Sequence, residues 1–172
     1  GKAPSDAKPL EPDHKAQYKE LLHKANALSA QFQYDQALQF YQAAARLDES
    51  DPYLHFKIGR LYLLKEDHAK AMQAFRYSLA KEPNNAEALF ELARLYVVQG
   101  GTKEAQETLS RLLEVEPRHE EGLKLKARLL MSENHTHEAL QSLELLMGLP
   151  ELPEDRRIDY QAMMAECYIS RG

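Results

Sequence analysis

One pattern of residues returns every 34 positions along this chain and constrains the fold more than any other feature. Segment 86–119 shows the pattern, because its first apolar residues follow the spacing of an amphipathic helix. Gly100 and Gly101 then interrupt that helix, since glycine weakens a helix interior and adopts left-handed cap conformations easily. A second helical stripe follows, and Pro117 ends it because proline disfavours a helix before it. The unit is therefore predicted to be a helix, a tight turn and a second helix.

Small and large residues stay in register when the chain is cut into 34-residue windows that begin at residues 18, 52, 86 and 120. Small residues let two helices approach closely, and large residues fill the space beside them. This repetition predicts a stack of similar helix pairs. Positions 8, 20, 24 and 11 of the windows hold, in turn, Ala25, Gly59, Ala93 and Ala127; Ala37, Ala71, Ala105 and Ala139; Tyr41, Phe75, Leu109 and Leu143; and Leu28, Tyr62, Tyr96 and Leu130.

The spacing resembles the tetratricopeptide repeat (TPR), a 34-residue unit with Leu-Gly, Tyr, Ala, Phe and Pro at fixed offsets. Window 52–85 carries this signature, although His55 stands where the family has a bulky residue at position 4. The matching residues are Ile58, Gly59, Tyr62, Ala71, Phe75 and Pro83. The resemblance implies an all-α fold, in which antiparallel helix pairs stack into an α-α superhelix, the TPR solenoid. For function it implies a scaffold, because the repeat is reused for many different partners.

The predicted array fills most of the chain. Residues 1–11 are polar, contain two prolines and are predicted to be a flexible lead-in to a TPR array over residues 12–172. The predicted repeats are 18–51, 52–85, 86–119 and 120–153, followed by a partial fifth repeat or capping helix at 158–172. The apolar Met163, Met164 and Ile169 favour an incomplete repeat over a cap. Lys126 occupies an apolar position of the fourth repeat, and its stem is expected to pack while its ammonium reaches water.

The first helices offer a candidate binding groove, since in proteins that resemble this one they line the concave side. At 100° per residue, positions 4, 7, 8 and 11 share one side of the helix, and positions 2, 5, 9 and 12 share the opposite side. The second set is expected to project into the groove. It includes Tyr53, Phe56, Arg60, Leu63, Phe90, Arg94, Val97 and Arg128.

Two interpretations of these groove residues stay open. The apolar patch of Phe56, Phe90, Leu63 and Val97 is covered by a partner segment, the lead-in, a neighbouring repeat or a second copy of the chain. The three arginines either bind carboxylates, for which their planar fork is suited, or are ordinary solvated charges. Arg94 is also expected to pair with Glu91, three residues earlier in the same helix.

Composition and motifs exclude several other classes of protein. The net charge of -5 disfavours non-specific binding of nucleic acid, and no apolar run approaches the length of a membrane span. Cys167 is the only cysteine, so an intramolecular disulfide is excluded, and it is expected to be a small buried apolar residue. No catalytic motif or cofactor-binding motif is found, and His135 and His137 are interpreted as a solvated turn, not as metal ligands. The chain is therefore not expected to be an enzyme.

These observations favour a non-catalytic scaffold that binds a peptide or helical segment with apolar and acidic groups. An alternative is a regulatory or docking TPR arm of a larger enzyme, or of a bacterial envelope assembly, secretion or polysaccharide-export machine. Self-association through the C-terminal helix is a further hypothesis. The chain is expected to be soluble, and both the cytoplasm and the periplasm fit its composition.

Overall fold

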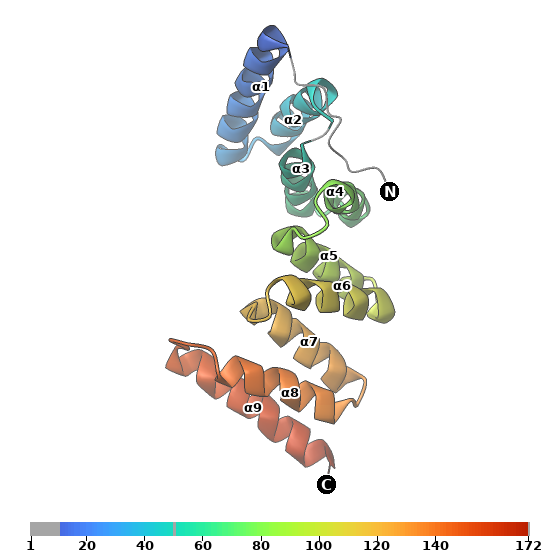
Figure 1. Ribbon diagram of the computed structural model, residues 1–172, viewed down its shortest axis with the longest axis vertical. Helices are drawn as coiled ribbons and strands as arrows, with labels where there is room; N and C mark the ends of the chain where they lie inside the picture. The colour runs from blue at the N-terminus through green and yellow to red at the C-terminus, as the bar shows by residue number, and fades with distance from the viewer. Residues whose placement is uncertain (1–10, 50, 172) are drawn as a thin grey trace. The chain divides into compact units, whose positions relative to one another are not determined.

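Figure 1 shows the computed structural model of the chain, which describes residues 11–49 and 51–171. Over these ranges the chain forms α-helices and no strand, so the predicted all-α fold is confirmed. The helices are α1 (Pro12–Ala30), α2 (Tyr34–Leu47), α3 (Pro52–Leu64), α4 (His68–Lys81), α5 (Ala86–Val98), α6 (Thr102–Val115), α7 (Glu120–Ser132), α8 (Thr136–Met147) and α9 (Glu154–Arg171). Residues 1–10 of the expected lead-in and Gly172 lie outside the described residues.

The turn between the two helices of a pair contains one residue in the left-handed region. Phe32, Glu66, Gly100 and Asn134 have φ values of 61°, 59°, 74° and 61°, and each stands at position 15 of its 34-residue window. Glycine adopts this conformation without the steric cost that a Cβ atom adds. Gly100 therefore makes the turn that the sequence predicts, and the other pairs make the same turn without glycine.

Asp51 joins two helices at the start of the second repeat. Its side chain accepts a hydrogen bond from the backbone N–H of Tyr53 at 2.9 Å, which caps the N-terminus of α3 after Pro52 at the first helical position. The hydroxyl of Tyr18 in α1 donates to the other oxygen of the same carboxylate. Burial and this hydrogen bond raise the pKa of Tyr18 above its usual value. The carboxylate therefore ties α1 to the beginning of α3.

The chain divides into two compact units, and the boundary lies within α5, after Ala88. In unit 1 (Gly1–Ala88), α1 packs on α2, α2 on α3, and α3 on α4. The small residues Ala25 and Ala37 and the ring of Tyr41 are buried together, as their places in the repeat predict. The chain thus fills the interface between paired helices with the alternation of small and large side chains that the sequence pattern indicates.

Unit 2 (Leu89–Gly172) has a core in which α8 packs against both α7 and α9. Ala127, Ala139 and Leu143 repeat the buried positions that Ala25, Ala37 and Tyr41 occupy in unit 1. In α9, Tyr160 and Cys167 are buried seven residues apart. Leu54 and Leu61 of α3 and Gly122 and Leu129 of α7 have the same spacing and the same burial. The helix α9 therefore packs with the register of a first helix.

The expectations for Cys167 and Lys126 can be compared with the structure of unit 2. Cys167 is buried and free, so it behaves as the small apolar residue that was expected. Lys126 is half-buried and lies beside Leu123 and Leu130 at the edge of a surface crevice, which agrees with a packed stem. Among the helices of the described ranges, none combines the length and the apolar character that crossing a bilayer requires.

Candidate interaction surfaces

The expected groove residues of unit 1 lie on α3, and one of them is buried. Tyr53 is 53% exposed, Arg60 is exposed and Leu63 is half-buried, so these three side chains reach the surface. Phe56 is only 4% exposed and packs against Phe75 of α4, with 5.8 Å between the ring centroids. The expectation that Phe56 projects outward is therefore wrong. A helical wheel assigns position 5 to the outer side, but the ring gains more by packing on a neighbouring aromatic side chain than by facing water.

In unit 2 the expected groove residues of α5 form a small cluster. Phe90 is half-buried and lies beside the ring of His119, with 5.1 Å between the ring centroids. The guanidinium of Arg94 lies over the face of the same phenyl ring, 5.7 Å from its centroid, which is a cation–π contact. Val97 is half-buried, two turns after Phe90 along the helix. These side chains present an aromatic and aliphatic surface with a cation beside it.

The arginines of unit 2 differ in their surroundings. Arg94 is exposed and donates to the carboxylate of Glu91 at 3.0 Å, as its place in the helix predicts. Such exposed pairs contribute about 0.2–1 kcal/mol, so the guanidinium can exchange this partner for another carboxylate. Arg128 is exposed on α7 and has no ion pair with the described residues. Both arginines are therefore accessible to an acidic ligand.

A second kind of surface lies on α9. Ile158, Ala162, Ala165 and Ile169 are exposed and fall at the helical spacing i, i+4, i+7 and i+11, on the side opposite the buried Tyr160. Ile169 is 78% exposed. An exposed stripe of this kind marks a surface for association, because isolated apolar residues at the surface are common but continuous stripes are not.

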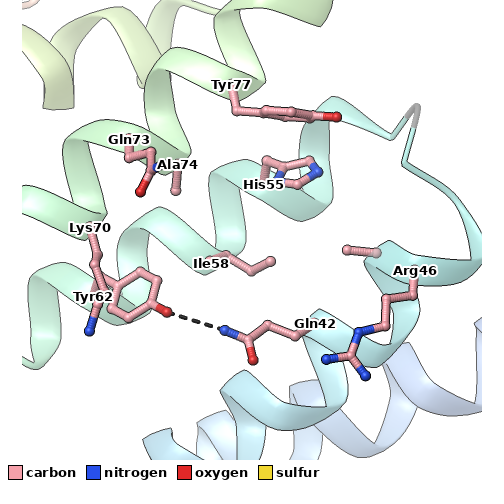
Figure 2. Close-up of a pocket in the computed structure, with 10 residues that line it drawn as sticks. Gln42, Arg46, His55, Ile58, Tyr62, Lys70, Gln73, Ala74 and Tyr77 are labelled. Carbon is pink, nitrogen blue, oxygen red and sulfur yellow. Dashed lines mark hydrogen bonds between the residues drawn. The ribbon is translucent and has the colours of Figure 1, made fainter.

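A crevice between the second helices of unit 1 was missed by the sequence analysis. It has a volume of about 600 Å³ and lies between α2 and α4, over α3, and we call it the α2–α4 crevice. Figure 2 shows its lining residues, which include Arg46, His55, Tyr62, Lys70 and Tyr77. The one sequence signal for it is His55, because this side chain is smaller than the bulky residue that the repeat usually has at position 4.

The histidines of the α7–α8 turn lie at the surface. His135 and His137 are both exposed, and a ring nitrogen of His137 lies 3.3 Å from the side-chain nitrogen of Gln141. Within residues 11–49 and 51–171, no group of three or more His, Cys, Asp or Glu side chains is arranged to hold a metal ion.

Comparison with known proteins places the chain in a family. A model described as tetratricopeptide repeat matches residues 62–129, and one described as TPR repeat matches residues 25–66. A search of curated protein sequences finds no significant match.

Solved structures share the fold. MamA superposes with a TM-score of 0.81 at 13% identity, over 91% of this chain and 83% of that one. YrrB, described as a TPR protein with an unusual peptide-binding site, gives 0.76 at 22% identity, over 95% of this chain and 85% of that one. The first TPR of Spaghetti (RPAP3), bound to the HSP90 peptide SRMEEVD, gives 0.63 at 20% identity, over 68% of this chain and 93% of that one. The helix pairs, the buried repeat positions and the matched models agree, and the chain belongs to the tetratricopeptide repeat family.

Proposed function

We propose that the chain is a non-catalytic scaffold that binds a segment of another protein on the outward side of its first helices. The observation that carries this proposal is the cluster of Phe90, Arg94 and Val97, which the core of unit 2 leaves at the surface. Aromatic side chains and arginine are enriched at protein interfaces, and an apolar neighbour such as Val97 adds buried area beside them. Their presence side by side on α5 favours recognition of a polypeptide.

The known relatives support a peptide as the ligand. YrrB is described as having a peptide-binding site, and the Spaghetti repeat is bound to a peptide. The peptide SRMEEVD contains acidic residues. For this chain, we propose a segment that brings apolar side chains to Phe90 and Val97 and carboxylates to Arg94 and Arg128. In unit 1, Tyr53, Arg60 and Leu63 offer similar chemistry, whereas Phe56 contributes to the core.

The charge of the ligand can be tested with a pair of reversals in unit 2. Peptides selected from a random display library against the full chain are expected to combine Asp or Glu with Phe, Leu or Ile. For these peptides, the double variant Arg94→Glu, Arg128→Glu is expected to raise Kd at least tenfold, since about 1.4 kcal/mol corresponds to that factor. The loss has a physical cause, because each reversal replaces an attraction to a carboxylate by a repulsion. Fluorescence anisotropy with labelled peptides measures it.

A matched control separates the site from the net charge. Lys103 at the start of α6 and Arg118 in the following turn are exposed, and reversing both changes the net charge by the same amount. The control variant Lys103→Glu, Arg118→Glu is expected to keep the affinity of the wild type. Equal losses of affinity in both variants would mean that the effect comes from net charge alone. Unchanged affinity in both variants would mean that the first helices of unit 2 do not form the site.

The exposed stripe of α9 favours a second candidate, in which the chain works within a larger assembly. A second copy of the chain is the simplest occupant, because two such stripes can bury one another across a two-fold axis. Light scattering on the eluting protein is expected to show a concentration-dependent dimer. Ile158→Glu, Ile169→Glu is expected to return it to a monomer, and Glu166→Gln on the same helix is expected to leave it dimeric. A monomer at every concentration would reject self-association through α9.

A further inference from the structure

The α2–α4 crevice is bounded by side chains of three helices in unit 1. Gln42, Ala45 and Arg46 come from α2, and Lys70, Gln73, Ala74 and Tyr77 come from α4. The side chains of His55, Ile58 and Tyr62 rise from α3 to form its base. These residues occupy positions 4, 7 and 11 of the repeat, on the opposite side of α3 from Arg60 and Leu63. The crevice is therefore distinct from the surface proposed above.

Position 4 of this repeat holds a histidine in place of the bulky residue of the family pattern. A bulky residue at this position would occupy space between the second helices. His55 instead lies against one wall, where its ring packs on Tyr77 with 4.0 Å between centroids. Its Nε2 atom is buried and has no hydrogen-bond partner among the described residues. A buried nitrogen without a hydrogen-bond partner costs about 1–3 kcal/mol, so this placement of His55 lowers the stability of unit 1.

The lining of the crevice is basic and aromatic, although the chain as a whole is acidic. Arg46 and Lys70 stand at its rim, and no Asp or Glu is among the residues that line it. Arg46 has no ion pair with the described residues. Lys70 is exposed, pairs with Asp67 at 3.0 Å and lies over the ring of Tyr62. Since the chain has 27 acidic and 22 basic residues, a crevice whose charged lining residues are all cations differs from the composition of the whole chain.

The equivalent crevice of unit 2 provides a natural comparison. It lies between α6 and α8, over α7, has a volume of about 350 Å³ and is lined by residues at matching repeat positions. There Leu123 replaces His55, Leu130 replaces Tyr62, and Leu145 replaces Tyr77. Glu138 stands where unit 1 has Lys70. A gap between second helices is therefore a general product of this stacking, whereas aromatic rings with cations belong to the α2–α4 crevice.

We propose that the α2–α4 crevice is a second docking site, which binds an acidic peptide segment that carries an aromatic side chain. The aromatic side chain packs between Tyr62 and the rings of His55 and Tyr77, over Ile58. Carboxylates on either side of it bind Arg46 and Lys70. Gln42 already donates to the Tyr62 hydroxyl at 3.2 Å, and its carbonyl oxygen and the amide of Gln73 suit the backbone groups of an extended peptide.

A short peptide titration tests this assignment on the full chain. The probe is Ac-Glu-Phe-Glu-NH2, followed by ¹H–¹⁵N correlation spectra of labelled protein into the millimolar range. Saturating shift changes are expected at backbone amides of α2, α3 and α4 around the crevice. Ac-Lys-Phe-Lys-NH2 tests the charge and Ac-Glu-Ala-Glu-NH2 tests the ring, and each is expected to bind at least tenfold more weakly.

Two variants with different chemistry locate the binding. The double variant Arg46→Glu, Lys70→Glu reverses the charge at the rim, and Ala45→Phe fills the crevice without changing its charge. Each is expected to raise Kd at least tenfold and to keep the helical circular dichroism spectrum. Arg94→Glu, Arg128→Glu is expected to leave this binding unchanged, so failure of this site and failure of the first-helix site are distinguished. The absence of saturable shifts, shifts confined to other surfaces, or equal binding by the rim variant would overturn the proposal.

Discussion

Gly59→Ala is expected to destabilise unit 1 by about 1–3 kcal/mol, which is the range for inserting a methyl group into a well-packed core. A Cβ atom at Gly59 would lie 2.7 Å from Cε1 of Phe75 and 2.9 Å from its Cδ1. Phe75 is fully buried, so its ring has little room to move away. The loss is expected although alanine favours helix more than glycine by about 1 kcal/mol.

The chain itself suggests the change that restores stability. Wherever a later repeat has alanine at position 8, it has leucine at position 24: Ala93 goes with Leu109, and Ala127 with Leu143. Phe75→Leu alone is expected to cost about 1–2 kcal/mol, less than the roughly 3–5 kcal/mol of a Phe→Ala change, because leucine refills part of the space. In the double variant the added methyl group occupies that space. The double variant is therefore expected to lose less stability than the sum of the two single-variant losses. The expected coupling energy is about 1 kcal/mol or more.

A double-mutant cycle measures this coupling. Hydrogen exchange of peptides from α3 and α4 reports local stability, which suits a repeat array because its units need not unfold together. Ala93→Gly provides the reverse control, since it removes a methyl group from a position where leucine is the neighbour in the repeat. Additive losses in the cycle would show that Gly59 and Phe75 do not share one packing constraint.

The repeat period determined most of the fold, for a definite physical reason. Positions 8, 20 and 24 meet within one helix pair, so their sizes must match locally, and local matching is visible in one sequence. Ala37, Ala71, Ala105 and Ala139 are all fully buried, as their position predicts. Three of the left-handed turns hold a residue other than glycine, which was harder to predict. The conformational preference of one turn residue is weak, and the packing of the two helices outweighs it.

The candidate sites were less predictable, because they depend on space left between elements. A helical wheel placed Phe56 on the outer side of α3, yet its ring packs against Phe75 of α4. The α2–α4 crevice depends on the absence of a bulky residue at His55 and on what α2 and α4 contribute to its sides. The residue pattern of one helix shows neither the packing of Phe56 nor the crevice. Both depend on the space that neighbouring helices leave between them.

Tyr160→Ala is expected to produce the largest loss in unit 2, about 3–5 kcal/mol, as for other buried aromatic residues replaced by alanine. Tyr160 is 0% exposed, and its hydroxyl donates to Glu120 at the start of α7 at 2.5 Å. Arg156 of α9 donates to the other oxygen of the same carboxylate. Glu120 thus receives two donors from α9, and removing the ring is expected to release α9 from the rest of unit 2.

Tyr160→Phe removes the hydroxyl and keeps the ring, so it distinguishes the contribution of the hydrogen bond from that of the ring. It also allows a test in alkaline solution. Burial, and then the hydrogen bond to Glu120, raise the pKa of Tyr160 above its usual value. A pKa that is higher in the folded state contributes stability that is fully present below the unfolded value of about 10 and is lost as the pH rises above it. The wild type is therefore expected to lose stability more steeply than Tyr160→Phe above that pH, although it is the more stable protein at neutral pH.

Tyr168→Phe is the matched control, because it makes the same change on the same helix at a side chain that is 56% exposed. The stability of the wild type, Tyr160→Phe and Tyr168→Phe is measured by thermal unfolding, followed by circular dichroism from neutral pH into the alkaline range. Hydrogen exchange of α9 peptides reports the local stability of α9. Taking Tyr168→Phe as reference cancels the titration of lysines, which all the variants share. If Tyr160→Phe and Tyr168→Phe had parallel pH profiles, the hydrogen bond to Glu120 would not hold α9 in place, and apolar packing of Tyr160 and Cys167 would remain as its attachment.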